Sequence, residues 1–284
     1  MNFYDRSPVE QSKMSEKIHK VLADRNLGSR RKMERWVIDG RVHVNSEVAT
    51  LGQRVSESDV IEVDGKCIPY RQSQTHIRII VMNKDVGEIV TRNDPENRPT
   101  VFTRLPSLHH DRWISIGRLD FVTSGLLLFT NHGLLAHRLM HPSSGIDREY
   151  AVRIFGKLDQ THRQMMLDGI VVDGHRLRFT DVQYYSGGRS NHWYHVVLME
   201  GRNREVRQLF HEFGYTVSRL KRVRFGPIVL PKGLKRGQFR ELPTTDVFAL
   251  CKWLRVVDDT SMGHLSQTKS TESFLIPYPG LDAF

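Results

Sequence analysis

Cysteine is nearly absent from this chain of 284 residues, which contains only Cys67 and Cys251. Two cysteines in separate halves of the sequence exclude a disulfide framework, and they are too few for a cysteine-rich zinc site. No apolar run reaches the ~18 residues that a membrane-spanning helix requires, and no signal-peptide pattern opens the chain. The sequence therefore predicts a soluble, cytoplasmic protein with no membrane partner.

Several motifs that would announce a cofactor are also missing. There is no Gly-rich dinucleotide turn and no phosphate loop. His137 and His141 stand four residues apart, with His132 nearby, and this spacing can bind zinc on a helix. However, no Glu follows His137 as a metalloprotease base, and Pro142 interrupts the helix pattern. We therefore expect no metal and no other cofactor. A histidine–metal hydrolase remains a minor alternative, which full activity in excess chelator would exclude.

Positive charge is the first feature that the chain has in excess. Its net charge is +10, its isoelectric point is near 9.7, and its aromatic content is that of a globular protein. Residues 200–240 carry eleven Lys or Arg against three acidic residues, a net charge of +8. Phe210, Phe213, Tyr215 and Phe225 are interleaved with these cations. A charge run is usually a solvated face, but this combination favours a surface that binds nucleic acid.

The first part of the chain predicts a small basic domain. Residues 1–14 lack periodicity and are expected to form a flexible arm, followed by a domain over 15–69. Within it we expect a helix over 17–23, a second helix from the N-cap Ser29 to Ile38, and strands at 41–45 and 59–63. Arg30, Arg31 and Lys32 occupy the first turn of the second helix, where the helix dipole disfavours cations. This placement is consistent either with a strained surface helix or with a docked phosphate.

The remainder predicts a larger α+β domain with a mixed, mainly antiparallel sheet. Residues 70–76 are polar and are expected to be a linker, and the domain extends over 77–256. Strands are expected at 77–82, 150–155, 176–185 and 193–199, and helices at 134–140, 161–168 and after residue 204. Residues 257–284 shift to Ser, Thr, Gly and Pro and are expected to be a disordered tail.

The polar connection that contains Asp120 is the most informative segment. It lies between a short strand pattern at 113–116 and a buried one at 125–130, so both of its ends are held by the core. An isolated Arg-x-Asp is more often a turn whose Asp bonds its own backbone. Here the whole run from Gly117 to Asn131, GRLDFVTSGLLLFTN, resembles the signature of the small-subunit-type ribosomal pseudouridine synthases. The residues from Ser29 to Asn45 likewise resemble the S4 RNA-binding module, which is a usual N-terminal attachment in that family.

The resemblance implies roles for specific residues. Asp120 would be the catalytic nucleophile, Arg207 would pair with it, Tyr150 would stack on the target base, and Arg118 would position the flipped nucleotide. On its own, Tyr150 is more often a half-buried strand residue, and Arg207 a surface residue at the edge of an apolar helix stripe. RNA contacts are expected from the following basic and polar residues: Arg30, Arg31, Lys32, Arg35, Lys84, Arg202, Asn203, Arg204, Lys221 and Arg222.

The implied reaction converts uridine to pseudouridine in ribosomal RNA by flipping the base out of its stack. It is an isomerisation, so no cofactor is needed, and the aspartate could act as a nucleophile or take a proton from the ribose. Residues 91–102 and 230–234 resemble the members of the family that act on 23S rRNA of the large subunit. The partner is therefore expected to be 23S rRNA, and the protein to act as a monomer. The alternatives are the same chemistry on 16S rRNA and a non-catalytic RNA-binding or ribosome-assembly protein with the same S4 module.

Overall fold

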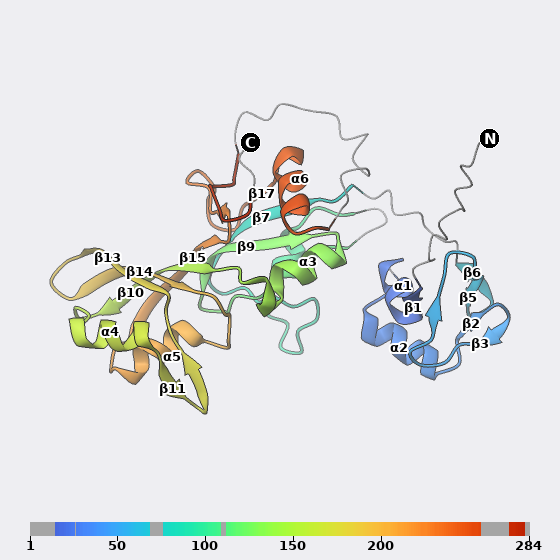
Figure 1. Cartoon of the computed structure of the whole chain (residues 1–284), viewed down its shortest axis with the longest axis horizontal. Coiled ribbons are helices and arrows are strands. Elements are labelled where there is room, and N and C mark those ends of the chain that lie inside the picture. The colour runs from blue at the N-terminus through green and yellow to red at the C-terminus, as the bar shows by residue number, and fades with distance from the viewer. Residues whose placement is uncertain (1–14, 26, 69–75, 109–111, 257–272, 282–284) are drawn as a thin grey trace, which may run out of the picture. The chain divides into compact units, whose positions relative to one another are not determined.

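The computed structural model describes residues 15–25, 27–68, 76–108, 112–256 and 273–281 (Figure 1). It contains two compact units, Met1–Thr75 with Leu108–Arg112, and His76–Ser107 with Trp113–Phe284. The arm over 1–14 and most of the linker over 70–76 lie outside the described residues, so those boundaries stay predictions. None of the described helices is long and apolar enough to cross a membrane.

The N-terminal unit packs two helices against a small sheet. Helix α1 spans Ile18–Asp24 and α2 spans Arg30–Ile38. The Ser29 hydroxyl accepts a hydrogen bond from the Lys32 amide at 3.2 Å, which confirms the predicted N-cap. Ile18, Leu22 and Met33 are fully buried between the helices and the strands. The strands are β1 (Glu16–Lys17) paired with β4 (Arg54–Val55), and a sheet in the order β3 (Glu47–Val48), β2 (Val42–Val44), β5 (Ile61–Val63) and β6 (Lys66–Ile68).

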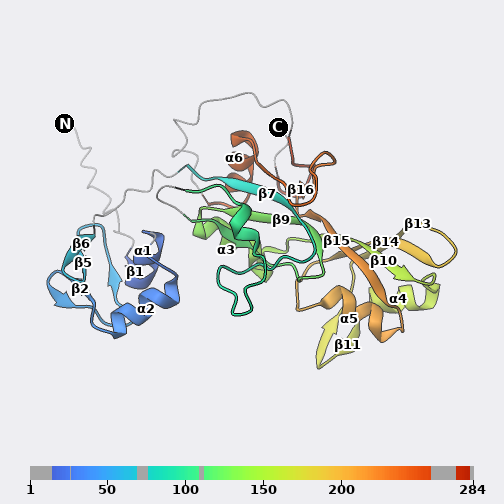
Figure 2. The same ribbon diagram turned by 180° about the vertical axis from the view of Figure 1, so that it is seen from behind.

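The larger unit is built on one long sheet, which crosses the middle of the unit in both views (Figures 1 and 2). Its order is β13 (Asp181–Gly187), β14 (Asn191–Leu198), β10 (Arg148–Phe155), β15 (Val217–Phe225), β9 (Ser124–Thr130), β7 (Ile79–Lys84) and β17 (Phe239–Glu241). β8 (Ile114–Ile116) also pairs with β9, and β16 (Ile228–Val229) with β15. Among the described strand pairs of this sheet, only β15 with β9 is parallel. The prediction of a mixed, mainly antiparallel sheet is therefore confirmed.

The parallel pair at the centre of the sheet depends on Gly125. This residue has φ of +102° and lies opposite Arg222 on β15. A Cβ atom at position 125 would be 2.2 Å from the Arg222 carbonyl oxygen and 2.8 Å from its amide nitrogen. Both neighbours are backbone atoms that cannot rotate away, so only glycine allows the two strands to approach this closely.

Helices cover the sheet in separate groups. α3 (Gly133–Met140) and α6 (Thr244–Trp253) share one apolar cluster with strands β7 and β9, in which Leu128, Leu139 and Leu250 are fully buried. α4 (Gln160–Asp168) contacts the edge strand β13, and α5 (Glu205–Glu212) contacts the central strand β15. A hairpin of β11 (Ile170–Val172) and β12 (His175–Leu177) and two short 3₁₀ helices, Val101–Arg104 and Pro142–Ser144, complete the unit.

Two expectations about this unit are wrong. The strand expected over 176–185 is interrupted between β12 and β13, which belong to different sheets. The tail expected to be disordered over 257–284 contains an ordered segment at 273–281. Asp246 accepts hydrogen bonds from the Ser273 hydroxyl and the Phe274 amide, and the Tyr278 hydroxyl donates to Asp147 at 2.8 Å. Composition suggested disorder, but these polar partners and the apolar cluster at α6 hold the segment in place.

Candidate active site

The turn that carries Asp120 is held by its backbone. The Asp120 carbonyl accepts from the Thr123 amide at 3.0 Å, and the carbonyl of Phe121 accepts from the Gly87 amide at 2.9 Å. A guanidinium nitrogen of Arg207 donates to the Val122 carbonyl at 3.2 Å. The side chain of Asp120 itself is exposed. The turn therefore presents a carboxylate to solvent from a fixed backbone, which is the arrangement that a nucleophile or base requires.

Lys84 also holds the turn in place, and its position contradicts the expectation that it contacts RNA. It lies fully buried at the end of β7, where its ammonium donates to the carbonyls of Asp85 at 2.8 Å, Thr123 at 2.9 Å and Asp120 at 3.1 Å. Burial lowers the pKa of Lys84 to about 8, although the charges of Glu88, Asp85 and Asp120 oppose that shift. An enclosed ammonium with three backbone acceptors cannot contact RNA. Lys84 instead fixes both ends of the turn.

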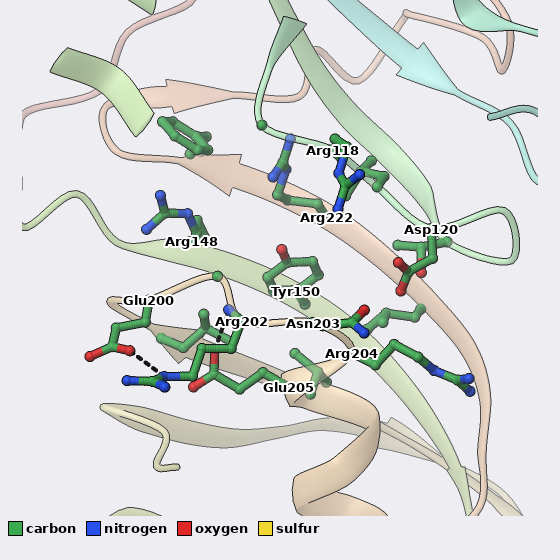
Figure 3. A pocket seen from close by; sticks show the side chains of 18 of the residues that line it. Arg118, Asp120, Arg148, Tyr150, Glu200, Arg202, Asn203, Arg204, Glu205 and Arg222 are labelled. Atoms are coloured by element: carbon green, nitrogen blue, oxygen red, sulfur yellow. Dashed lines mark hydrogen bonds and ion pairs between the residues drawn. The ribbon is translucent and has the colours of Figure 1, made fainter. Parts of the chain in front are cut away.

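Asp120 opens onto a cavity of about 460 Å³. The cavity is lined by the 117–123 turn, the strands β10 and β15, the end of β14 and the residues that precede α5. In the view of Figure 3, Tyr150 lies in the middle of the site, Asp120 to its right, and Arg118 and Arg222 above it. The polar residues that line the cavity are Ser115, Arg118, Asp120, Thr123, Arg148, Tyr150, Glu200, Arg202, Asn203, Arg204, Glu205 and Arg222.

The register of the sheet explains why Tyr150 and Arg222 share the site. The two residues are directly opposite each other on the antiparallel strands β10 and β15, so their side chains leave the sheet on the same face. Tyr150 is 9% exposed and Arg222 is 2% exposed. Arg222 was expected to bind RNA from the surface. It is instead buried in the wall of the cavity, where its Nε donates to the Leu126 carbonyl at 2.7 Å.

The segment before α5 closes the cavity opposite the turn. Arg202, Asn203 and Arg204 are exposed and line the cavity, as their predicted RNA contacts require. The Arg202 side chain is bound by Glu200 at 2.6 Å, and Arg204 adopts a left-handed conformation with φ of 52° immediately before the helix. This left-handed residue turns the chain sharply between the cavity-lining segment and the start of α5.

Arg207 does not form the ion pair with Asp120 that the resemblance implied. Its guanidinium donates to the carbonyls of Val217 at 2.9 Å and Val122 at 3.2 Å, and it is not among the residues that line the cavity. Burial and the nearby Arg204 lower the pKa of Arg207, while the charge of Asp120 opposes this. In this structure the arginine is therefore coupled to Asp120 through the Val122 backbone and at longer range through charge.

The expected cations of the N-terminal unit are available for binding. Arg30, Arg31, Lys32 and Arg35 are all exposed on α2, and the Lys32 ammonium lies 5.1 Å from the centre of the Trp36 ring. The first turn of α2 contains no acidic residue. In the larger unit, Lys221 is partly buried on β15, and desolvation and the charge of Arg236 lower its pKa.

Arg148, Glu205 and Phe225 are among the cavity-lining residues that sequence reasoning missed. The signal for Arg148 was present, because it stands two residues before Tyr150 on the same strand and therefore on the same face. Phe225 could not be placed without the pairing of β10 with β15, which sets it opposite Arg148. Glu205 is buried at the start of α5, where burial raises its pKa.

His141, the second histidine of the pair, has a structural role as a helix cap. α3 ends at Met140, and His141 caps the following 3₁₀ helix by accepting a hydrogen bond from the Ser143 amide. The ring centres of His137 and His141 are 5.1 Å apart. Within the described ranges, no group of three or more His, Cys, Asp or Glu side chains is arranged to hold a metal ion.

Comparisons with known proteins agree on one family. A family model described as RNA pseudouridylate synthase matches residues 78–212, and a model of the S4 domain matches residues 16–61. Ribosomal large subunit pseudouridine synthase B from Escherichia coli strain K12 is 47% identical over 251 residues, which cover 87% of this chain and 86% of that protein. The protein of the same name from Pseudomonas aeruginosa is 50% identical over 236 residues, or 82% of this chain, but the match spans only 61% of that longer protein.

The fold agrees with a solved structure as well. A crystal structure of a pseudouridylate synthase superposes with a TM-score of 0.58 at 22% identity, covering 82% of this chain and 99% of that one. This likeness supports the predicted α+β fold, and the two family-model matches confirm an S4 domain ahead of a synthase domain in the sequence.

Proposed function

Because this chain belongs to the RNA pseudouridylate synthase family, we propose that it isomerises uridine to pseudouridine in ribosomal RNA, with 23S rRNA as the substrate. The relatives that are about half identical to it over most of its length carry the name of a large-subunit synthase. The observation that carries the proposal is the exposed Asp120 on a turn whose backbone carbonyls from Asp120 to Thr123 all accept hydrogen bonds, at the edge of a cavity with Tyr150 at its centre.

Each proposed role follows from position. Asp120 attacks C1′ of the flipped uridine or removes a proton from the ribose, because it is the one exposed carboxylate on the rigid turn. Tyr150 offers an aromatic face to the uracil, which replaces part of the stacking that the base loses when it leaves the RNA. Arg118 is exposed beside the cavity and can contact the phosphates that flank the flipped nucleotide.

The remaining cations serve binding. Arg202 and Arg204 border the entrance of the cavity, and the exposed cations of α2 supply a second contact with RNA. Arg207 positions the turn through the Val122 carbonyl. Because RNA binding by Lys and Arg releases counterions, the affinity should fall steeply as salt is added.

The test is release of tritium from unmodified 23S rRNA labelled at C5 of uridine, because the C5 hydrogen is lost only when C5 becomes bonded to C1′. We expect release by the wild type and none by Asp120→Asn, which keeps the size and shape of the side chain but cannot act as a nucleophile. RNA affinity should change less than about threefold, since the carboxylate repels phosphates rather than binding them. Release by Asp120→Asn would refute the role of the aspartate.

A second pair of variants tests whether Tyr150 stacks on the flipped base. Tyr150→Phe should retain most of the turnover because the ring is preserved, whereas Tyr150→Ala should lose at least about 5-fold, since stacking of one base on an aromatic ring is worth about 1–3 kcal/mol. Absence of release by the wild type on both 23S and 16S rRNA would favour a non-catalytic RNA-binding protein.

A further inference from the structure

Arg222 has a buried cationic group with no counter-ion. It is 2% exposed, and among the described residues no ion pair includes its guanidinium. Nε is bonded to the Leu126 carbonyl, but the terminal NH2 nitrogen has no hydrogen-bond partner in the described part of the chain. Burying an unpaired charge and leaving its N–H groups unsatisfied are both costly. Such a group is retained where a ligand supplies the missing partner.

A second buried arginine strengthens the positive potential of the same wall. Arg148 is 9% exposed, and its NH1 donates only to the carbonyls of Ile146 at 2.7 Å and Met199 at 2.6 Å. The two guanidinium groups flank the Phe225 ring, with Arg148 4.9 Å and Arg222 5.2 Å from its centre. Two cations that share one ring, with no ion pair to either among the described residues, create a site suited to negative charge on an oxygen atom.

The position of the Arg222 guanidinium indicates which part of a bound nucleotide it faces. Arg222 is directly opposite Tyr150 across the β10–β15 pair, and the side chains of such pairs leave the same face with their Cβ atoms about 5 Å apart. Both residues line the cavity onto which Asp120 opens (Figure 3). A uracil ring that stacks on Tyr150 with its C1′ near Asp120 therefore brings a ring carbonyl oxygen toward Arg222.

We propose that Arg222 is a further catalytic residue, whose guanidinium binds a carbonyl oxygen of the flipped uracil and stabilises the negative charge that the ring acquires when it is detached. The proposal rests on the synthase function above. When the C1′–N1 bond breaks, its electron pair passes to N1 and is shared with O2 and O4. This holds whether Asp120 bonds to C1′ or a proton is taken from the ribose. C5 then forms the new bond to C1′, displacing Asp120 or returning the proton to the ribose, and the proton on C5 leaves as H⁺.

The alternative source of negative oxygen is an RNA phosphate, and the two sources give different kinetics. We compare Arg222→Met with Arg219→Met, a matched control that removes one exposed cation from the same strand. If Arg222 acts on the uracil, the single-turnover rate at saturating enzyme falls by about 10²–10³-fold while the RNA dissociation constant stays within about threefold. If Arg222 binds a phosphate, the dissociation constant rises, the salt slope decreases by about one unit, and the saturated rate is unchanged. The second result would overturn the proposal.

A substrate change separates catalysis from a structural defect. Fluorine at C5 stabilises the detached uracil anion, so RNA with 5-fluorouridine at the target should depend less on Arg222. The ratio of wild-type to Arg222→Met rates for loss of the target nucleoside, measured after digestion, should be at least about 10-fold smaller with 5-fluorouridine than with uridine. If the ratio were the same for 5-fluorouridine and uridine, the slower rate of Arg222→Met would reflect a displaced cavity wall, and the proposal would be overturned. If Arg222→Met does not fold, Arg222→Gln, which removes the charge but keeps hydrogen-bond donors, gives the same comparison. Failure of the wild type to act on uridine would instead refute the synthase function.

Discussion

Gly125→Ala is expected to damage both the stability and the activity of the larger unit. The added Cβ would be 2.2 Å from the Arg222 carbonyl oxygen, a distance that no real Cβ contact adopts, so β9 must separate from β15. The positive φ of +102° adds strain of its own. Left-handed backbone costs about 1–2 kcal/mol for a residue with a Cβ, and overpacking adds about 1–3 kcal/mol. The free energy of unfolding should therefore fall by about 2–5 kcal/mol.

Gly117 provides the matched control. It belongs to the same motif and has φ of +74°, but a Cβ there would meet nothing within 4 Å. Gly117→Ala should therefore cost only the backbone strain, about 1–2 kcal/mol. Urea unfolding measures the difference, since about 2 kcal/mol lowers the midpoint by about 1 M for a slope near 2 kcal/mol/M.

Gly125→Ala should also lose more activity than Gly117→Ala. Separation of β9 from β15 moves Asp120, which precedes β9, relative to Tyr150 on β10, the strand that pairs with the other side of β15. A misplacement of about 1 Å in a catalytic group can reduce turnover by about 10²-fold. Equal urea midpoints for Gly125→Ala and Gly117→Ala would refute the argument, because they would show that close contact between the strands imposes no requirement at position 125.

Three further predictions follow from the described contacts. Folding lowers the pKa of Lys84 from 10.5 to about 8. Between these pH values the lysine is protonated in the unfolded chain but largely neutral in the folded protein. The contribution of Lys84 to the free energy of unfolding therefore rises with pH over that range. Turnover should nevertheless fall as the pH rises through 8, because the neutral Lys84 amine has only two N–H donors for its three carbonyl acceptors. If kcat of Lys84→Met declined in the same way as the pH rises, this explanation would be contradicted. Tyr278→Phe should lower the free energy of unfolding by about 1 kcal/mol, since Asp147 loses one of its hydrogen bonds, and an unchanged thermal midpoint would show that the C-terminal segment contributes nothing there. Changing Arg30 and Arg31 to Gln should weaken rRNA binding and reduce its salt slope by about 1.5 units, whereas an unchanged slope in filter-binding titrations would remove the phosphate contact assigned to α2.

The local motifs were accessible to sequence reasoning because they depend on neighbours in the chain. The Ser29 cap and α2 follow from capping and periodicity, and the strands on either side of Asp120 follow from their apolar runs. The run from Gly117 to Asn131 indicated the family, which the comparisons confirm. The roles of the individual site residues stay predictions.

Only the tertiary structure decided which charges line the cavity and which are buried elsewhere. Lys84 and Arg222 looked like surface cations because the sequence does not reveal what covers a side chain. One is buried beneath the Asp120 turn and the other in the cavity wall. Likewise, the distance between Arg207 and Asp120 depends on how α5 packs against the sheet, and the ordered segment at 273–281 depends on partners more than 25 residues away. Net charge and local pattern are properties of the chain itself, whereas burial and pairing across strands arise only when distant segments pack together.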